Sequence, residues 1–310
     1  IKHTPNNRGF VLNRDTTVTM AAVFTFGRTM LSYRHAFHAG NHADMLKHLV
    51  LYFVLDYYNR KDKAYTYVDT HSGAGLYDLQ AAFAQKVGEY KQGWERLHQA
   101  APLPQGLQAF VEHVQSTLES EHAYCGSPWL AASLLREQDK AKLFELHPSD
   151  FDLLRGNIAS LHRGRQIQLF KDNGYQGLIG LMPPPSRRGV VLIDPPYETA
   201  QDYRAVIDTL KAALERFATG TYMLWYPLLS RRESIELAGH LQKLAPNNYL
   251  QAELWVHAPR ADGFGMHGSG MFVINPPYVL AEQLQAALPV LTETLAQDDS
   301  AHFVLQHQTA

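Results

Sequence analysis

The sequence predicts an α/β fold, a mostly parallel, doubly wound sheet with a small helical insertion. From Asn41 onward, short apolar runs typical of strands alternate with amphipathic helical patterns. Most of these runs follow one another at the spacing of a strand–helix–strand unit. The first and second are about 75 residues apart, however, where such a unit needs about 30. The excess predicts an inserted subdomain.

The first elements are a helix and a strand. Asn41 suits the N-cap of a helix that runs to about Lys61, because apolar residues recur in it at three- and four-residue spacing. A strand is predicted at 64–69. The insertion then spans about 77–124. Helical patterns in it occupy residues 88–98 and 107–118.

Further strands are predicted after the insertion, with helical patterns between most of them. They cover residues 142–146, 166–170, 189–193, 221–226, 251–257 and 271–275. We assign 30–310 to one domain. Residues 1–29 are polar and loosely patterned, and we expect them to be a disordered or non-native extension before a true start at Met30.

Composition limits the classes of function. The chain is 45% hydrophobic and 19% charged, enough apolar material for a large core, and no run approaches the ~18 apolar residues of a membrane-spanning helix. The single cysteine, Cys125, excludes an internal disulfide and favours a reducing compartment, the cytoplasm. A net charge of −2 argues against a histone-like protein that binds polyanions over its whole surface, but it allows a local basic face. Without further cysteines we expect no metal, despite the spacing of His35, His38, His42 and His48.

A strand that ends in a G-x-G turn is the first functional motif, in the segment Tyr67 to Gly75. Glycines at 73 and 75 let the backbone pass close to a nucleotide-like ligand. A tight turn without a ligand is the alternative. Because no third glycine follows at the spacing of a pyrophosphate site, an adenosine-bearing ligand without a pyrophosphate fits better than a dinucleotide.

Acidic residues follow the next two strands. Glu145, at the tip of the second strand, is placed to accept hydrogen bonds from both ribose hydroxyls once the insertion is allowed for. A surface glutamate beside a helix N-terminus is the alternative. Asp172, after the third strand, either receives an adenine amino group or is a turn residue before Asn173 and Gly174.

The most informative motif is the segment Asp194-Pro195-Pro196-Tyr197 after an apolar strand. The lone pair of an exocyclic purine amine is delocalised into the ring, so methylation of this amine needs acceptors that favour a pyramidal nitrogen. The Asp194 carboxylate and the Pro195 carbonyl are such acceptors. Tyr197 supplies a flat face on which an extruded base stacks. A strand-terminating turn is the alternative.

The segment Asn275 to Tyr278 has almost the same form. The strand count separates the two, because Asp194 follows the fourth predicted strand, where methyltransferase sheets carry the motif, and only 32 residues remain after Tyr278. We expect Asn275 to end the last long strand and this segment to be at most a wall of the pocket.

Specific motifs are spread from Met30 to near the C-terminus. They are Met30 to Asp44, Leu46-Lys47-His48, Asp69 to Gly75, Gly126-Ser127-Pro128, Glu145 to Asp150, Ser186 to Gly189 and Asp194 to Tyr197. Together they resemble the RlmJ family of ribosomal RNA adenine-N6 methyltransferases. The resemblance implies a Rossmann-like, S-adenosylmethionine-dependent methyltransferase sheet with a helical insertion. It also implies a monomer that methylates an adenine of 23S ribosomal RNA, preferably before ribosome assembly.

The resemblance also implies roles for single residues. Asp194 is the catalytic and cofactor-facing carboxylate, with Pro195 and Tyr197 beside it. Lys47 is a further catalytic candidate, near Tyr33 and His35 on an N-terminal tail that contacts the substrate. The family has a glycine where this chain has Asn173, which tolerates the same backbone conformations. The cofactor-binding candidates are His48, His71, Gly73, Ser127, Glu145, Asp172, Asn173 and Asp194.

Other functions stay open on the residues alone. A DNA adenine-N6 methyltransferase, or a factor for the use of external DNA, has the same chemistry at the base. A nucleic-acid-binding protein with a vestigial cofactor fold is disfavoured by the intact Asp194, Tyr197 and Glu145, and a nicotinamide oxidoreductase by the missing third glycine. Arginines and a lysine either form a basic strip for RNA phosphates or are solvated, namely Arg163, Arg165, Lys171, Arg187 and Arg188.

Overall fold

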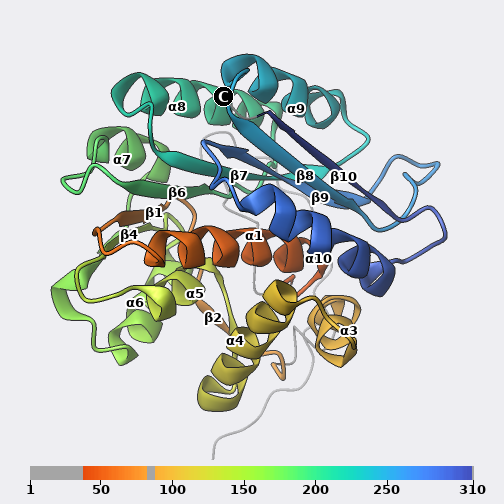
Figure 1. The fold of residues 1–310 in the computed structure, drawn as a ribbon, viewed down its shortest axis with the longest axis horizontal. Helices are drawn as coiled ribbons and strands as arrows, with labels where there is room; N and C mark the ends of the chain where they lie inside the picture. The colour runs from red at the N-terminus through yellow and green to blue at the C-terminus, as the bar shows by residue number, and fades with distance from the viewer. Residues whose placement is uncertain (1–37, 82–87, 309–310) are drawn as a thin grey trace, which may run out of the picture. The chain divides into compact units, whose positions relative to one another are not determined.

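The computed structural model describes residues 38–81 and 88–308 (Figure 1). Within these residues, eight strands form one sheet in the order β10-β8-β9-β7-β6-β1-β4-β5. The strands from β5 to β7 run parallel, and β9 is antiparallel to its neighbours, as is β10 to β8. The predicted α/β fold is therefore confirmed. The strands are β1 (Thr66–Asp69), β4 (Lys140–Phe144), β5 (Ile167–Phe170), β6 (Gly189–Ile193), β7 (Thr221–Leu228), β8 (Tyr249–Trp255), β9 (Gly268–Ile274) and β10 (His302–Gln308).

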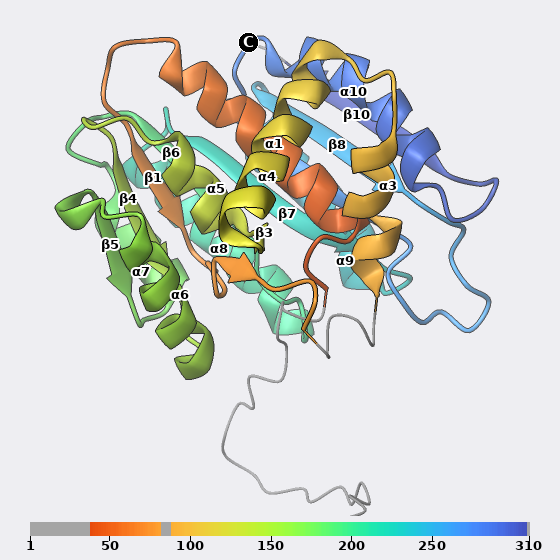
Figure 2. The same cartoon turned by 90° about the horizontal axis from the view of Figure 1, so that it is seen from below.

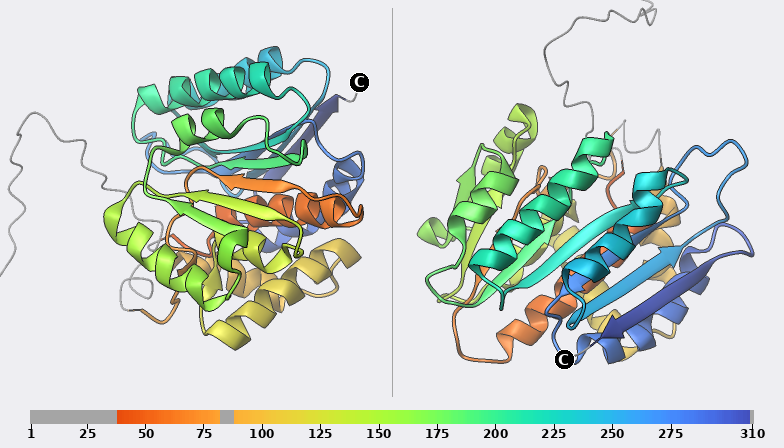
Figure 3. Two further views of the ribbon diagram at one scale, coloured as in Figure 1. Left: turned by 90° about the vertical axis from the view of Figure 1, so that its left-hand side faces the viewer. Right: turned by 90° about the horizontal axis from the view of Figure 1, so that it is seen from above.

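Helices cover both faces of the sheet (Figures 1 and 3). One face packs against α7 (Gly174–Leu181), α8 (Ala200–Arg216) and α9 (Arg232–Leu244). The other packs against α1 (His42–Asn59), α5 (Ser127–Leu134), α6 (Pro148–Ser160) and α10 (Leu280–Leu295). Among the helices that the structure describes, none is long and apolar enough to cross a membrane.

The predicted helices between the first two strands of the sheet are present. They are the 3-10 helix η2 (Glu89–Gln92), α3 (Trp94–Gln99) and α4 (Gln105–Glu121). They lie between two short strands that pair with each other, β2 (Leu76–Tyr77) and β3 (Tyr124–Cys125). A further 3-10 helix, η3 (Gly164–Gln166), precedes β5. Figure 2 shows α1 between the sheet and α4, so α4 of the insertion packs on the side of α1 that faces away from the sheet.

Helix α1 begins as predicted and is buried more completely than its amphipathic pattern indicates. The side chain of Asn41 accepts hydrogen bonds from the backbone N–H groups of Ala43 and Asp44, as an N-cap does. The sheet packs on one side of α1 and α4 and α10 on the other, and Asp44, Lys47 and His48 are all buried. A buried lysine requires partner charges, which the sheet supplies.

Two predictions about the C-terminal part are wrong. β9 is not the last long strand, since β10 follows α10 and pairs with β8 along its whole length. Because β9 is antiparallel, Asn275 lies at the amino edge of the parallel strands and cannot be a wall of a pocket at their carboxyl edge. There Asn275 has a φ of +53°, and its Nδ2 donates to the carbonyls of Ala218 and Gly220, both at 2.7 Å. The segment therefore closes the turn before β7.

Candidate active site

The candidate site lies where four neighbouring parallel strands end. Asp69 is the last residue of β1, Glu145 directly follows β4, and Asp194 directly follows β6. These strands are adjacent in the sheet, so their carboxyl ends meet at one edge, the edge at which doubly wound sheets bind ligands. Asp172 follows β5, the outermost of the four.

Asp194 is held by a buried lysine from α1. The Nζ atom of Lys47 donates to Asp194 Oδ2 at 2.7 Å and also lies 2.9 Å from Asp44 Oδ1. Burial alone would lower the pKa of Lys47, but the charges of Asp194 and Asp44 outweigh it and raise this pKa above its ordinary value. Lys47 is therefore a permanent cation, and the structure brings this predicted catalytic candidate into contact with Asp194.

A second buried carboxylate, Asp69, was not among the predicted site residues. Its Oδ2 accepts from the hydroxyls of Tyr67 and Ser127, both at 2.8 Å, and its Oδ1 accepts from the N–H of His71 at 3.2 Å. Burial raises the pKa of Asp69 to about 6, with a further increase from the charge of Asp194, against the lowering by its hydrogen bonds. Its position as the last strand residue before the G-x-G turn was the signal available in the sequence. Ser127 thus enters the site through Asp69.

The glycine turn and Glu145 are joined directly. Gly73 and Gly75 have φ values of +61° and +83°, and a Cβ at Gly73 would lie 2.3 Å from the hydroxyl of Tyr77. The Gly73 N–H donates to Glu145 Oε2 at 2.8 Å, and the His147 N–H donates to Oε1 at 2.6 Å. A carboxylate accepts about four hydrogen bonds, so Glu145 keeps acceptor capacity for two further donors.

The two histidines predicted to bind the cofactor differ in position. His48 is fully buried, and its Nδ1 is 2.8 Å from the hydroxyl of Tyr124, so its ring lies inside the core and not on the open edge. His71 follows the site residue Asp69 and packs edge-on against Tyr175, with 4.9 Å between ring centroids. Burial lowers the pKa of His71 to about 4, so this imidazole is neutral near pH 7.

Asp172 and Asn173 form the turn into α7. The Asp172 side chain is exposed, and its Oδ1 accepts from the Asn173 N–H at 2.7 Å. Asn173 is the N-cap of α7, with Oδ1 accepting from the N–H groups of Tyr175 and Gln176. Its φ of −66° is not left-handed, so the conformational freedom that a glycine offers is not needed here. Asn173 has a capping role that explains its presence without a ligand.

Tyr197 does not offer a stacking face in this structure, contrary to the sequence-based expectation. Its side chain is 2% exposed, its hydroxyl donates to the carbonyl of Trp225 at 2.9 Å, and its ring packs on Tyr203 with 4.6 Å between centroids. The reason is local: Tyr197 has a φ of +51°, which turns the chain after the prolines and directs the ring into the core. Stacking on a base requires that this ring move.

Trp225 is a residue that the sequence reasoning missed. It lies on β7 immediately after Leu224, the partner of Ile193, and so beside Asp194 across the strands. Its ring centroid is 5.9 Å from Lys47 Nζ, and within the described part of the chain its buried Nε1 has no hydrogen-bond partner. The only sequence signal was an aromatic residue at the carboxyl end of the strand next to β6.

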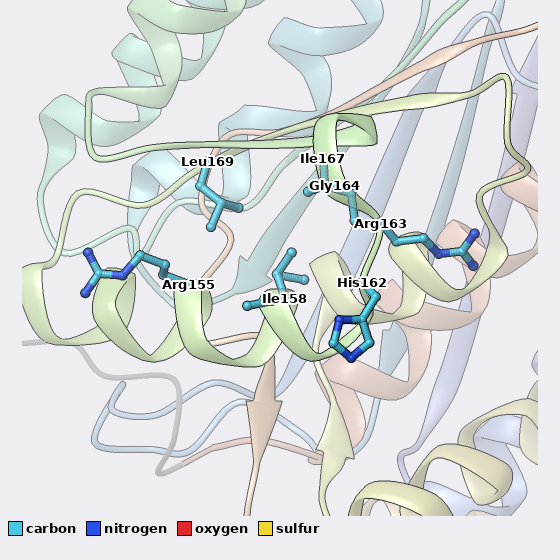
Figure 4. Close-up of a pocket in the computed structure, with 8 residues that line it drawn as sticks. Arg155, Ile158, His162, Arg163, Gly164, Ile167 and Leu169 are labelled. Atoms are coloured by element: carbon cyan, nitrogen blue, oxygen red, sulfur yellow. The ribbon is translucent and has the colours of Figure 1, made fainter.

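The remaining predicted residues lie elsewhere. Tyr33 and His35 are outside the described residues. Of the residues predicted to form a basic strip, Lys171 directly follows β5 at the carboxyl edge, whereas the others precede β5 or β6, at the edge opposite Asp194: Arg163, Arg165, Arg187 and Arg188. A shallow depression there, between α6 and β5, is lined by Arg155, Ile158, His162 and Arg163 among others (Figure 4). Since β5 is three strands away from β6, this depression is separate from the candidate site.

Comparison with known proteins decides the family. Residues 62–308 match the family described as "Ribosomal RNA large subunit methyltransferase D, RlmJ". The chain belongs to this family. It is 42% identical over 280 residues to ribosomal RNA large subunit methyltransferase J of Haemophilus influenzae, with 89% of this chain and 98% of the relative covered. Identity to the Escherichia coli protein of the same name is 45% over 275 residues, covering 88% and 97%. A crystal structure of a Legionella pneumophila protein has a TM-score of 0.79 and 30% identity, covering 87% of this chain and 98% of that one.

As a member of the RlmJ family, the chain is a methyltransferase with S-adenosylmethionine as its cofactor, as the sequence predicts. The residues present fit that cofactor. The Gly73 position leaves no room for a side chain, and Glu145 keeps lone pairs for two ribose hydroxyls. Leu146, 48% exposed beside Glu145, is an apolar surface suited to an adenine ring. When bound, the cofactor supplies an electrophilic methyl group.

Proposed function

We propose that this enzyme methylates the N6 amine of an adenine in 23S ribosomal RNA, acting on protein-free RNA before assembly. The observation that carries the proposal is the Asp194-Pro195-Pro196-Tyr197 segment at the carboxyl end of β6, with its carboxylate held by the buried Lys47. The names of the relatives support the RNA substrate. We further propose a cytoplasmic monomer, with residues 30–310 as one domain that contains a helical insertion at about 77–124.

The two carboxylate oxygens of Asp194 have different partners. Lys47 donates to Oδ2, which leaves Oδ1 to accept one N–H of the target amine, and the Pro195 carbonyl accepts the other. Two acceptors on one amine favour a pyramidal nitrogen whose lone pair is free to attack. Bound S-adenosylmethionine would supply the methyl group that this lone pair accepts, its C–S bond breaking as the N–C bond forms.

The same contacts explain how the reaction ends. The methylated nitrogen carries an extra proton, and the Asp194 carboxylate that already accepts its N–H is the base in contact with it. Lys47 stays protonated throughout because two carboxylates surround it, so its hydrogen bond keeps Asp194 Oδ2 in place before attack. No covalent bond between enzyme and substrate is needed.

The test uses S-adenosylmethionine labelled in the methyl group, with protein-free 23S RNA, assembled large subunits and duplex DNA as separate substrates. We expect label in the free RNA and N6-methyladenosine after its digestion to nucleosides. Label in DNA alone would replace this proposal by the DNA methyltransferase, which otherwise has no observation in its favour. Light scattering of the pure protein tests the monomer.

A further inference from the structure

An exposed phenylalanine lies in a loop at the carboxyl edge of the sheet, the edge that carries Asp194. Phe264 is 76% exposed and lies in the loop 256–267 between β8 and β9. On β7, Trp225 lies level with Asp194, because the residues before them, Leu224 and Ile193, pair with each other. Leu228 lies three residues further along β7. It pairs with Gly268, the first residue of β9, which also pairs with Trp255 at the end of β8. Three residues of strand are about 10 Å, so the loop begins about 10 Å beyond Asp194 along the strands, at the same edge of the sheet and two to three strands to the side of β6.

The loop is fastened at its base. The Ala258 N–H donates to Asp298 Oδ2 at 3.0 Å, and the Gln297 N–H donates to the Val256 carbonyl at 2.7 Å, so the turn after α10 holds the stem. The Val256 N–H in turn donates to the His267 carbonyl at 3.0 Å. A loop with a fixed stem presents its tip in a defined direction.

The tip is shaped around the aromatic ring. Gly263 and Gly265, on either side of Phe264, have φ values of +72° and +86°, which L side chains rarely adopt. The Gly263 N–H donates to the Arg260 carbonyl at 2.9 Å, and the Phe264 N–H donates to Asp262 Oδ1 at 3.0 Å. The chain therefore turns on both sides of Phe264 and leaves its ring in water, where a large apolar side chain gains nothing for folding.

Positive charge lies next to this ring. The Arg260 guanidinium is beside Gly265, since its Nη1 would be 3.9 Å from a Cβ there. Gly263 in turn approaches Ser230, the neighbour of Arg231 in the loop after β7. Arg231 and Arg260 are exposed, and among the residues that the structure describes neither forms an ion pair with a carboxylate. The Arg231 guanidinium lies over the ring of Tyr203, 5.8 Å from its centroid. Exposed guanidinium groups near an exposed ring match the phosphates and bases of single-stranded nucleic acid.

We propose that Phe264 is a stacking platform for an unpaired base of the RNA substrate near the target adenine, with Arg260 and Arg231 contacting the adjacent phosphates. This inference rests on the proposed RNA substrate and adds the surface that binds the bases around the target. Base stacking on aromatic side chains tolerates any base, so the platform fixes the path of the strand and not the identity of its sequence.

The chain supplies its own control. Tyr278 is equally exposed, at 77%, but it packs edge-on against Tyr57 after β9, at the opposite edge of the sheet. Phe264→Ala should raise the KM for a 23S RNA fragment about 10-fold or more, with kcat within about twofold. Phe264→Trp should restore it, and Tyr278→Ala should leave KM unchanged. The affinity for S-adenosylmethionine, measured by calorimetry, should be the same in all three variants.

Equilibrium binding of the same RNA fragment, followed by fluorescence anisotropy, separates this inference from the proposed function. Phe264→Ala should weaken binding by about the same factor as the rise in KM, and Arg260→Ala should reduce the dependence of binding on salt. If wild-type and Phe264→Ala proteins bind RNA equally, or if Tyr278→Ala weakens binding as much, the platform is wrong even when the enzyme methylates RNA. If the wild type binds the fragment through Phe264 but transfers no methyl group, the proposed function fails and the platform stands.

Discussion

Lys47 and Asp194, 147 residues apart in the chain, form a buried ion pair with 2.7 Å between Nζ and Oδ2. Asp44 is the third member, one turn before Lys47 on α1, and it also accepts from the Gly40 N–H at 2.8 Å. One cation thus lies between two carboxylates, of which one belongs to the helix and the other to the catalytic edge. The buried α1 therefore fixes the position of the catalytic carboxylate.

Asp194→Ala should abolish most methyl transfer and leave the fold intact. The target amine loses the acceptor that orients it, an effect commonly worth 10²–10³-fold in kcat. Lys47 keeps Asp44 as its partner, so no buried charge is left alone. Single-turnover rates on a 23S RNA fragment, with circular dichroism for folding, test this expectation.

Asn275→Ala is the matched control from the similar segment at the opposite edge. It removes the hydrogen bonds to Ala218 and Gly220 and places alanine at a left-handed φ, so it should lower the free energy of unfolding by about 1–3 kcal/mol. Activity per folded molecule should stay near that of the wild type. A near-normal rate for Asp194→Ala with an inactive Asn275→Ala would reverse the catalytic assignment.

Lys47→Met should destabilise the protein more than Asp194→Ala does. Without the cation, the buried Asp44 and the partly buried Asp194 are two carboxylates that share one site, and removing one member of a buried charge pair costs about 3–5 kcal/mol. Urea unfolding of the two variants gives the comparison. The double variant Lys47→Met with Asp44→Asn should recover part of the loss, and equal stability of Lys47→Met and wild type would show that the ion pair is not a stabilising contact.

Much of this site could be predicted because strand ends obey simple rules. The end of β6 at Ile193 was predicted to the residue, and with it the place of Asp194, since an apolar run stops there and parallel strands share an edge. The glycine turn and Glu145 follow by the same rule. Asn41 was predicted as a cap because its side-chain chemistry is local.

What could not be predicted depends on packing between distant elements. The charge cluster of Lys47 requires that α1 pack against the carboxyl ends of β6 and β7, which no local pattern shows. The burial of Tyr197 follows from one positive φ after two prolines, and the motif alone indicates an exposed ring. β10 was missed because its polar, half-exposed residues pair only at the edge of the sheet. The five basic residues predicted as one strip are divided between two edges, because Lys171 follows β5 whereas the arginines precede β5 and β6.

Glu145→Ala should weaken the binding of S-adenosylmethionine by about 1.5–3 kcal/mol, the usual worth of hydrogen bonds to a charged acceptor. The ribose hydroxyls lose their acceptor, and the Gly73 N–H loses the partner that fixes the glycine turn. Calorimetry measures the affinity. Glu145→Gln, which keeps one carbonyl acceptor of the same size, should fall between wild type and alanine, and unchanged affinity in both variants would remove Glu145 from the cofactor site.

Stability should fall as the pH is lowered from 7 toward 4, in part through His42 at the start of α1. Burial lowers the pKa of His42 from its ordinary 6.5 to about 4, although Glu89 partly opposes this shift. Between these two values the unfolded chain binds a proton that the folded chain does not. The contribution of His42 to stability is therefore complete above pH 6.5 and decreases by up to about 1.4 kcal/mol per pH unit down to pH 4.

The His42→Gln variant isolates this contribution. Between pH 7 and pH 5 its free energy of unfolding should fall by up to about 2 kcal/mol less than that of the wild type, as measured by urea unfolding. Asp69 acts in the opposite direction, because its folded pKa of about 6 lies above its ordinary value and its protonation favours the folded state, but it is common to both proteins and cancels in the comparison. His240→Gln, at an exposed position on α9, should behave as the wild type does. If the free energy of unfolding falls by the same amount in all three proteins, burial of the His42 ring does not control the acid sensitivity.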